Sequence, residues 1–195
     1  MIQRRNGGDG VSLCGRTWKI GDRVRKNGKP KRMFFLVLVV SLWCGFLFLA
    51  PSILYFNTTS SIPAGFYVRI PATVIRKGDI VCYPPPNPVI QELQRMGATV
   101  KDDLLFIKEV GAVAGESYWI DKETGEFVAA GKRIGIARKV SSGNIPMPDH
   151  SGRHVVPEGE FLPVAPHIFS FDGRYTGTCP LSIITSRAVP LILFP

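Results

Sequence analysis

Two parts of the sequence carry residue types that could perform nucleophilic catalysis. The first is a run of four hydroxyl residues at positions 58–61, followed by Pro63 and Gly65. Proline fixes φ and glycine permits positive φ, so this segment can hold one hydroxyl in a defined, exposed direction. The same composition is typical of a polar linker, and this stretch alone does not decide between a catalytic loop and a linker.

The second part is the apolar run 104–110, which contains one lysine, Lys108. With the period-2 alternation of a strand, Lys108 shares a face with Phe106 and Val110. Burial among such neighbours disfavours the ammonium form and lowers the pKa of the amine, which would let Lys108 act as the base for a serine hydroxyl. The alternative is a lysine whose stem covers the core while its amine reaches water.

Other chemistries lack their usual residue patterns. The histidines lie in loop-like or proline-flanked sequence without triad spacing: His150, His154 and His167. No Cys-x-x-Cys pair, Cys/His metal spacing, phosphate-binding glycine loop or nucleotide fingerprint is present, so we expect neither a metal nor a cofactor. Cys82 and Cys179 fall in one predicted domain. They could form a disulfide or remain two buried free thiols, and the sequence leaves both open.

The elements that must position these residues are predicted to be mostly strands. The strand predictions cover residues 66–70, 80–83, 104–110, 118–120, 126–128, 159–162 and 188–194. Residues 111–116 are predicted as a turn, 89–96 as a short helix and 139–157 as an irregular loop. Many short strands, many turns and little helix predict an all-β domain over residues 55–195.

An uncharged apolar run precedes this domain. It extends from Met33 to Ala50 and continues through residues 51–56, which makes it long enough to span a hydrocarbon layer of ~30 Å. We interpret residues 33–54 as one transmembrane helix. We expect it to be retained rather than cleaved, because no small-x-small site follows it.

Charge is concentrated before the apolar run. Residues 1–32 hold ten basic and two acidic residues, so eight of the nine net positive charges of the chain lie there. The positive-inside rule places this tail in the cytoplasm, and we expect it to be disordered and to rest on anionic lipid headgroups. The rest of the chain has no basic face, which argues against nucleic-acid binding.

Five short motifs follow one another along residues 57–177. They read Asn57-x-Thr59-x-Ser61-x-Pro63-x-Gly65-x-Tyr67, Lys77-Gly78-Asp79-Ile80-Val81, Leu105-Phe106-Ile107-Lys108-x-Val110-x-Ala112-x-Ala114-Gly115, Val156-Pro157-Glu158-Gly159-Glu160-Phe161 and Ser170-Phe171-Asp172-x-Arg174-Tyr175-x-Gly177. Together they resemble the bacterial signal peptidase I clan (peptidase S26), and most closely its conjugative-transfer branch, the TraF-type peptidases that mature pilin precursors. The resemblance covers most of residues 55–195. It implies a mainly β, signal-peptidase-like all-β catalytic domain of short strands after one transmembrane helix.

The resemblance implies roles for six residues. Ser61 matches the nucleophile and Lys108 the general base. Thr59 matches the position whose hydroxyl joins the Ser61 backbone N–H in an oxyanion hole. Ser170 matches a residue that hydrogen-bonds and orients the lysine amine, and Asp172 and Arg174 match a supporting pair.

Spacing selects Ser61 over its neighbour Ser60. Ser61 lies two residues before Pro63 and two after Thr59, as in the TraF-type branch, whereas general signal peptidases place the serine three residues before their proline. If Ser61 and Lys108 form a dyad, Ser61 Oγ and Lys108 Nζ should lie ~2.6–3.2 Å apart.

The resemblance implies a serine endopeptidase in the bacterial inner membrane, with a cytoplasmic N-terminus and a periplasmic catalytic domain. It would process, or cyclise, a pilin or other exported precursor in conjugative transfer or type IV secretion. The expected partners are that precursor, inner-membrane lipids and the conjugation or secretion machinery. Two alternatives stay open: a general signal peptidase I, and a non-catalytic, membrane-anchored assembly factor of the same fold. Glu109 and Gly173 depart from the pattern of general signal peptidases, which have a basic residue and a serine there.

Overall fold

The structure is a computed structural model that describes residues 29–59 and 61–194, without the side chains of residues 29–30 and 48–52. Most of the predicted basic tail, residues 1–28, and Ser60 lie outside the described residues. The chain divides into two compact units, Met1–Trp43 and Cys44–Pro195.

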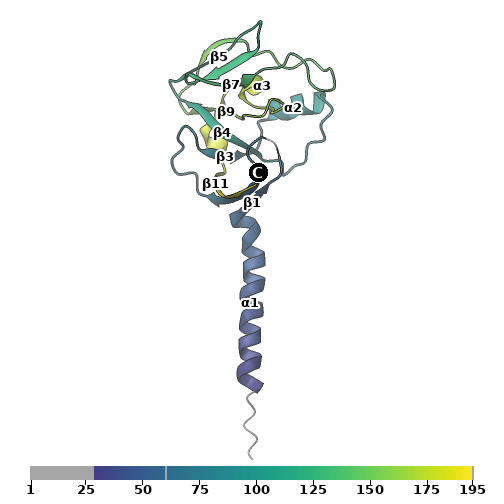
Figure 1. Cartoon of the computed structure of the whole chain (residues 1–195), viewed down its shortest axis with the longest axis vertical. Helices are drawn as coiled ribbons and strands as arrows, with labels where there is room; N and C mark the ends of the chain where they lie inside the picture. The colour runs from purple at the N-terminus through teal and green to yellow at the C-terminus, as the bar shows by residue number, and fades with distance from the viewer. Residues whose placement is uncertain (1–28, 60, 195) are drawn as a thin grey trace, which may run out of the picture. The chain divides into compact units, whose positions relative to one another are not determined.

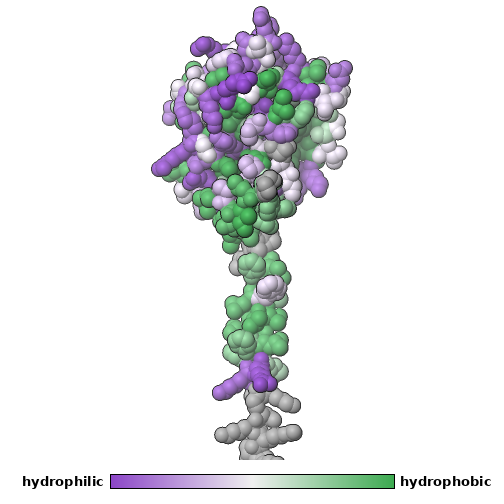
Figure 2. All heavy atoms as spheres, viewed as in Figure 1, coloured by the Kyte–Doolittle hydropathy of each residue, from purple (hydrophilic) through white to green (hydrophobic). Residues whose placement is uncertain are grey.

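Helix α1 extends over Lys29–Ile53. Its described side chains from Met33 to Leu47 are almost all apolar, and the large ones are exposed, as Figure 2 shows along the helix. Within the described part of the chain, no helix combines the length and the apolarity needed to cross a membrane. The assignment of residues 33–54 to a transmembrane helix stays a prediction.

The second unit is built on two antiparallel sheets (Figure 1). The larger sheet has the strand order β1-β2-β11-β3-β4-β9-β10. Its strands are β1 Leu54–Asn57, β2 Gly65–Ile70, β3 Ile80–Tyr83, β4 Phe106–Val113, β9 Glu160–Val164, β10 Cys179–Pro180 and β11 Ser186–Leu193. The smaller sheet has the order β7-β6-β5-β8, with β5 Ser117–Ile120, β6 Glu126–Ala129, β7 Lys132–Ile136 and β8 Gly152–Val155.

Helical structure in this unit is short. It consists of α2 Asn87–Arg95, α3 Gly173–Thr176 and the single 3₁₀ turn η1 Leu181–Ile183. α2 begins with proline in its first turn, where the missing N–H has no intrahelical partner to lose. The prediction of a mainly β domain is therefore confirmed.

Strand β4 differs from its prediction because it does not end at residue 110. It continues to Val113, and its register against β9 shifts between Val110 and Ala112. A Cβ on Gly111 would lie 2.4 Å from Val164 Cγ1, so only glycine lets the two strands approach this closely. The turn expected over residues 111–116 begins after this bulge.

Four strands lie where the sequence predicted none: β1, β7, β8 and β10. β1 directly follows α1, so its four residues read as the end of the apolar run. β8 lies inside residues 139–157, which were predicted to be an irregular loop, and pairs along the whole length of β5. That prediction is wrong for residues 152–155, because cross-strand pairing overrides the polar composition of the segment.

Three buried clusters form the core, and one of them supports the hydroxyl-rich loop. It consists of Ile62, Tyr67, Cys82, Ile107 and Ala188. Because Ile62 comes from the loop and Ile107 from β4, this cluster packs the loop against the strand that carries Lys108.

The two cysteines of the predicted domain are buried free thiols, on β3 and β10. Of the two alternatives that the sequence left open, the structure therefore has the unpaired one. Burial raises the pKa of Cys179 to about 12 and also raises the pKa of Cys82, so neither thiol is readily ionised.

Candidate active site

The loop at residues 57–63 is shaped by Asn57, the last residue of β1. Its buried side-chain amide donates to the carbonyl oxygens of Thr59, Ile62 and Pro63 over 2.8, 3.0 and 3.2 Å. Its amide oxygen accepts hydrogen bonds from the backbone N–H and the hydroxyl of Thr59, at 3.1 and 2.7 Å. One buried side chain therefore satisfies the polar groups at both ends of the loop and fixes the backbone around Ser61.

A second contact holds the end of the loop. The hydroxyl of Tyr67, on β2, donates to the carbonyl oxygen of Pro63 at 2.7 Å. The Tyr67 ring is fully buried in the same cluster as Ile62 and Ile107. The loop is thus fastened on both sides of Ser61, by a polar contact and by apolar packing.

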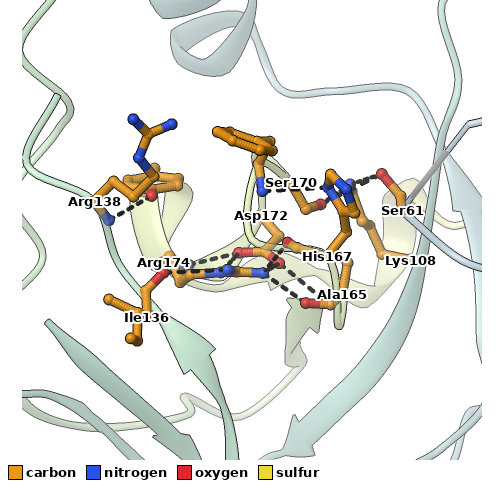
Figure 3. Close-up of polar contacts among 11 residues, drawn as sticks. Ser61, Lys108, Ile136, Arg138, Ala165, His167, Ser170, Asp172 and Arg174 are labelled. Carbon is orange, nitrogen blue, oxygen red and sulfur yellow. Dashed lines mark hydrogen bonds and ion pairs between the residues drawn. The ribbon is translucent and has the colours of Figure 1, made fainter. Parts of the chain in front are cut away.

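Ser61 and Lys108 are in contact, although 47 residues separate them. Lys108 lies on β4, opposite Val81 of β3, and its side chain points toward the loop (Figure 3). The distance from Lys108 Nζ to Ser61 Oγ is 2.7 Å, inside the range that the sequence predicted for a dyad. In a neutral lysine, the same contact would let Nζ accept the hydroxyl proton of Ser61.

The amine of Lys108 is removed from water. The residue is 4% exposed, and Nζ lies 5.4 Å from the centre of the Phe106 ring. Burial lowers the pKa of Lys108 to about 8; the charge of Asp172 raises it and that of Arg174 lowers it, both by less than burial does. The alternative of an amine that reaches into water is therefore wrong, and near pH 8 about half of these amines are neutral.

Ser170 lies beside Ser61 and Lys108, and these three residues are called the catalytic cluster. The Ser170 oxygen accepts a hydrogen bond from Lys108 Nζ at 2.6 Å and lies 3.3 Å from Ser61 Oγ. The residue is buried and lies in the segment between β9 and α3. The structure therefore brings Ser61, Lys108 and Ser170 together from three separate segments, and Ser170 restricts where the amine can point.

Asp172 and Arg174 form a buried ion pair beside this cluster, with 2.8 Å between Arg174 Nη2 and Asp172 Oδ2. Asp172 also caps α3 and accepts a hydrogen bond from the Ala165 N–H at 2.8 Å. Arg174 donates to the carbonyl oxygens of Ala165, His167 and Ile136.

Figure 3 shows these contacts as a network separate from the hydrogen bonds of Lys108. None of the contacts of the pair among the described residues reaches the side chain of Ser61 or Lys108. The pair therefore acts on the cluster indirectly, by fixing the segment that carries Ser170 and through the two charges.

Thr59 is placed differently from the other predicted site residues. It is exposed, and its hydroxyl hydrogen is directed to Asn57 Oδ1 rather than into the space beside Ser61. Its assignment to an oxyanion hole stays a prediction.

The sequence reasoning missed the role of Asn57. The residue opens the first motif, but nothing in its spacing shows that its partners are three backbone carbonyl groups of the same loop. A short polar residue at the end of a strand, directly before a hydroxyl-rich run, was the available signal.

One comparison with known proteins now adds to this geometry. A family model described as signal peptidase, peptidase S26, matches residues 28–193, which is most of the chain. No individual curated protein matches the chain. The matched range includes every residue of the cluster and both sheets that position it. The chain therefore belongs to the signal peptidase family, peptidase S26, and is a serine peptidase of the signal peptidase type.

Proposed function

We propose that this chain is a membrane-anchored endopeptidase that processes an exported precursor with a catalytic dyad of Ser61 and Lys108. The observation that carries the proposal is the 2.7 Å contact between Ser61 Oγ and the buried amine of Lys108. Burial lowers the pKa of this amine to about 8, which makes it a usable base near neutral pH.

The reaction begins when neutral Lys108 takes the hydroxyl proton of Ser61 and Oγ attacks the carbonyl carbon of the scissile bond. Negative charge develops on the carbonyl oxygen, next to the backbone N–H of Ser61. The Thr59 hydroxyl joins this N–H once it turns away from Asn57. Throughout these steps Ser170 accepts one N–H of Lys108 and keeps the amine aimed at Ser61.

Collapse of the tetrahedral intermediate expels the leaving amine, which takes the proton from Lys108, and leaves an acyl group on Ser61. Water then releases the product as a free acid. An amine of the same peptide would instead close a ring, and the cluster is compatible with either acceptor.

The membrane anchor is part of the proposal. It is supported by the uncharged apolar run of residues 33–50 and by the basic tail before it. A group of three exposed phenylalanines on β1, β2 and the C-terminal segment gives further support: Phe56, Phe66 and Phe194. An exposed apolar patch of this kind is typical of a membrane or protein interaction site. The catalytic domain would then lie at the periplasmic face of the inner membrane, with the tail in the cytoplasm.

A pilin of a conjugation or type IV secretion system is the precursor that we propose. Support comes from the spacing of Ser61 relative to Thr59 and Pro63, which follows the TraF-type pattern. The test is to offer membranes containing the protein a pilin precursor beside a panel of secretory precursors. Processing of the pilin alone supports this substrate, whereas processing of the whole panel would make the protein a general signal peptidase.

Substitution of the dyad tests the catalytic proposal. Ser61→Ala and Lys108→Ala should each reduce precursor processing in membranes by a factor of about 10³ or more, because nucleophile and base act as a unit. Ser142→Ala and Lys122→Ala change the same residue types at exposed positions and should leave processing intact. Undiminished processing in both dyad variants would instead favour a non-catalytic assembly factor.

A further inference from the structure

A cavity of about 440 Å³ lies beside the start of β1 and the segment that leads into β4. Its apolar walls come from Tyr55, Leu104 and Leu105, and exposed Lys101 and Asp103 lie along it. Arg69 of β2 lines it as well. None of these residues belongs to the catalytic cluster described above.

Arg69 enters this cavity from the inner face of β2. It lies two residues after Tyr67 and therefore on the same side of the strand, the side that packs beneath the hydroxyl-rich loop. Its guanidinium carbon is 5.4 Å from the centre of the Tyr55 ring, so the group lies over that aromatic face. β1 and β2 pair with Tyr55 opposite Tyr67, which fixes this stacking partner.

The Arg69 guanidinium forms no hydrogen bond or ion pair with the described residues. Its Nε atom is buried and makes no hydrogen bond. No ion pair joins Arg69 to Asp103, the carboxylate that lines the same cavity. A buried donor without an acceptor is unfavourable, and buried donors in native proteins are normally satisfied. A planar guanidinium matches the two oxygens of a carboxylate better than any other common partner.

The position of the cavity indicates what supplies that acceptor. β1 is an edge strand of the seven-stranded sheet, so its outer backbone groups are free to pair with an extended peptide. The chain passes directly from β1 through Asn57 to Ser61, while Leu104 and Leu105 lead to Lys108. A peptide that lies along β1 and reaches Ser61 therefore passes the cavity.

We propose that Arg69 forms a specificity subsite that binds an acidic side chain, Asp or Glu, of the precursor near the scissile bond. This subsite rests on the proposed endopeptidase function. Tyr55 holds the guanidinium in place from one side, and the two leucines exclude water around the ion pair. Because Arg69 does not contact Ser61 or Lys108, it selects the substrate without entering the chemistry.

The experiment uses the full chain in detergent micelles and a peptide library of random sequence. In the first readout, mass spectrometry of the cleavage products gives the frequency of Asp and Glu at each position around the cut. In the second, the same library is passed over immobilised Ser61→Ala protein, and the retained peptides are sequenced. The variants are Arg69→Gln, Arg69→Glu and Arg69→Lys, with Arg76→Gln as a matched control at an exposed arginine.

With unchanged Arg69, both readouts should show Asp or Glu enriched at one position. Arg69→Gln should reduce that enrichment about tenfold or more, the loss expected for a hydrogen bond to a charged group. Arg69→Glu should replace it with Lys or Arg, Arg69→Lys should keep part of it, and Arg76→Gln should leave it intact.

Two results separate the subsite from the proposed function. Cleavage with an acid preference that Arg69→Gln leaves unchanged would overturn the subsite and leave the endopeptidase standing. Retention of acidic peptides that depends on Arg69, without any cleavage, would support the subsite while the endopeptidase proposal fails. An equal retention of acidic and neutral peptides by the protein with unchanged Arg69 would also overturn the subsite.

Discussion

At the scale of single residues, the burial of Lys108 gives its amine the properties that a catalytic base needs. Apolar surroundings lower the pKa of its amine to about 8, and the two serine oxygens at 2.7 and 2.6 Å fix its direction. We therefore expect kcat/KM for precursor cleavage to rise with pH and to level off above an apparent pKa of about 8, because only the neutral amine can accept a proton. A pH–rate profile in micelles measures this. A flat profile between pH 6 and pH 9 would show that Lys108 is not the titrating base.

The same lowered pKa has a consequence for stability. In the unfolded chain a lysine amine has a pKa near its ordinary value of ~10.4. Between that value and about 8 the unfolded state therefore binds more protons than the folded state, and folding stability rises with pH across this window. Below it, the buried ammonium destabilises the fold.

Replacing the amine removes this penalty. We expect Lys108→Met to abolish cleavage while it raises the free energy of unfolding at pH 7 by about 1–3 kcal/mol, the balance of relieved desolvation and two lost hydrogen bonds. Urea unfolding of both proteins measures the change. The gain should disappear at pH 11, where the amine is neutral in both states, and a variant that is less stable at pH 7 would contradict this account.

At the scale of elements, the loop at residues 57–63 depends on Asn57 more than on its own hydroxyl residues. Asn57→Ala leaves the loop carbonyl groups and the Thr59 N–H without their buried partner. We expect it to lower the free energy of unfolding by about 1–3 kcal/mol and to reduce kcat more than it raises KM, because Ser61 is no longer held toward Lys108. Thr58→Ala, at an exposed position in the same loop, is the control and should change neither quantity. An Asn57→Ala protein with unaltered kcat would show that the loop keeps its shape without this side chain.

The segment that carries Ser170 has its own anchor, the ion pair of Asp172 and Arg174. Arg174→Met leaves the Asp172 carboxylate buried without its counter-charge, and we expect a loss of about 3–5 kcal/mol of stability. Arg133→Met breaks the exposed pair with Glu126 and should cost less than about 1 kcal/mol. Denaturant midpoints of the two variants give the comparison. If both variants lost a similar amount of stability, burial would not make the Asp172–Arg174 pair more important to the fold than an exposed pair.

The same scale shows what alternation and turn residues can predict. β2, β3 and the β5–β6 hairpin follow patterns that are legible within a few residues, and the structure has them where expected. β8 and the bulge at Gly111 depend on contacts with strands far away in the sequence: β8 exists because β5 offers it an edge, and Gly111 is required by Val164. Such contacts leave no local pattern.

At the scale of the whole molecule, the strand order of the large sheet determines which residues meet in the catalytic cluster. Ser61, Lys108 and Ser170 are separated by 47 and 62 residues and meet because the large sheet places β1, β4 and β9 around them. The motifs predicted that Ser61 and Lys108 would be in contact, and the 2.7 Å distance agrees. The hydrogen bonds of Asn57 and the missing partner of Arg69 were beyond prediction, because both depend on the three-dimensional path of the backbone.

Membrane topology is also a property of the whole molecule, and labelling of its cysteines tests the proposed orientation. In intact spheroplasts, a membrane-impermeant maleimide should leave Cys14 unlabelled if the basic tail is cytoplasmic. It should label a cysteine introduced by Lys132→Cys, an exposed position on β7, if the catalytic domain faces outward. Cys82 and Cys179 give little background, because both thiols are buried and have raised pKa values.

Permeabilised cells provide the control, since Cys14 should then react. Labelling of Cys14 in intact spheroplasts, with protection of the introduced cysteine, would reverse the proposed orientation. Release of the full chain into the soluble fraction by alkaline carbonate would contradict the proposed membrane anchor. Retention in the membrane, lost when two arginines replace Val39 and Leu42, would show that residues 33–50 hold the protein there, because charges at the centre of a bilayer are strongly disfavoured.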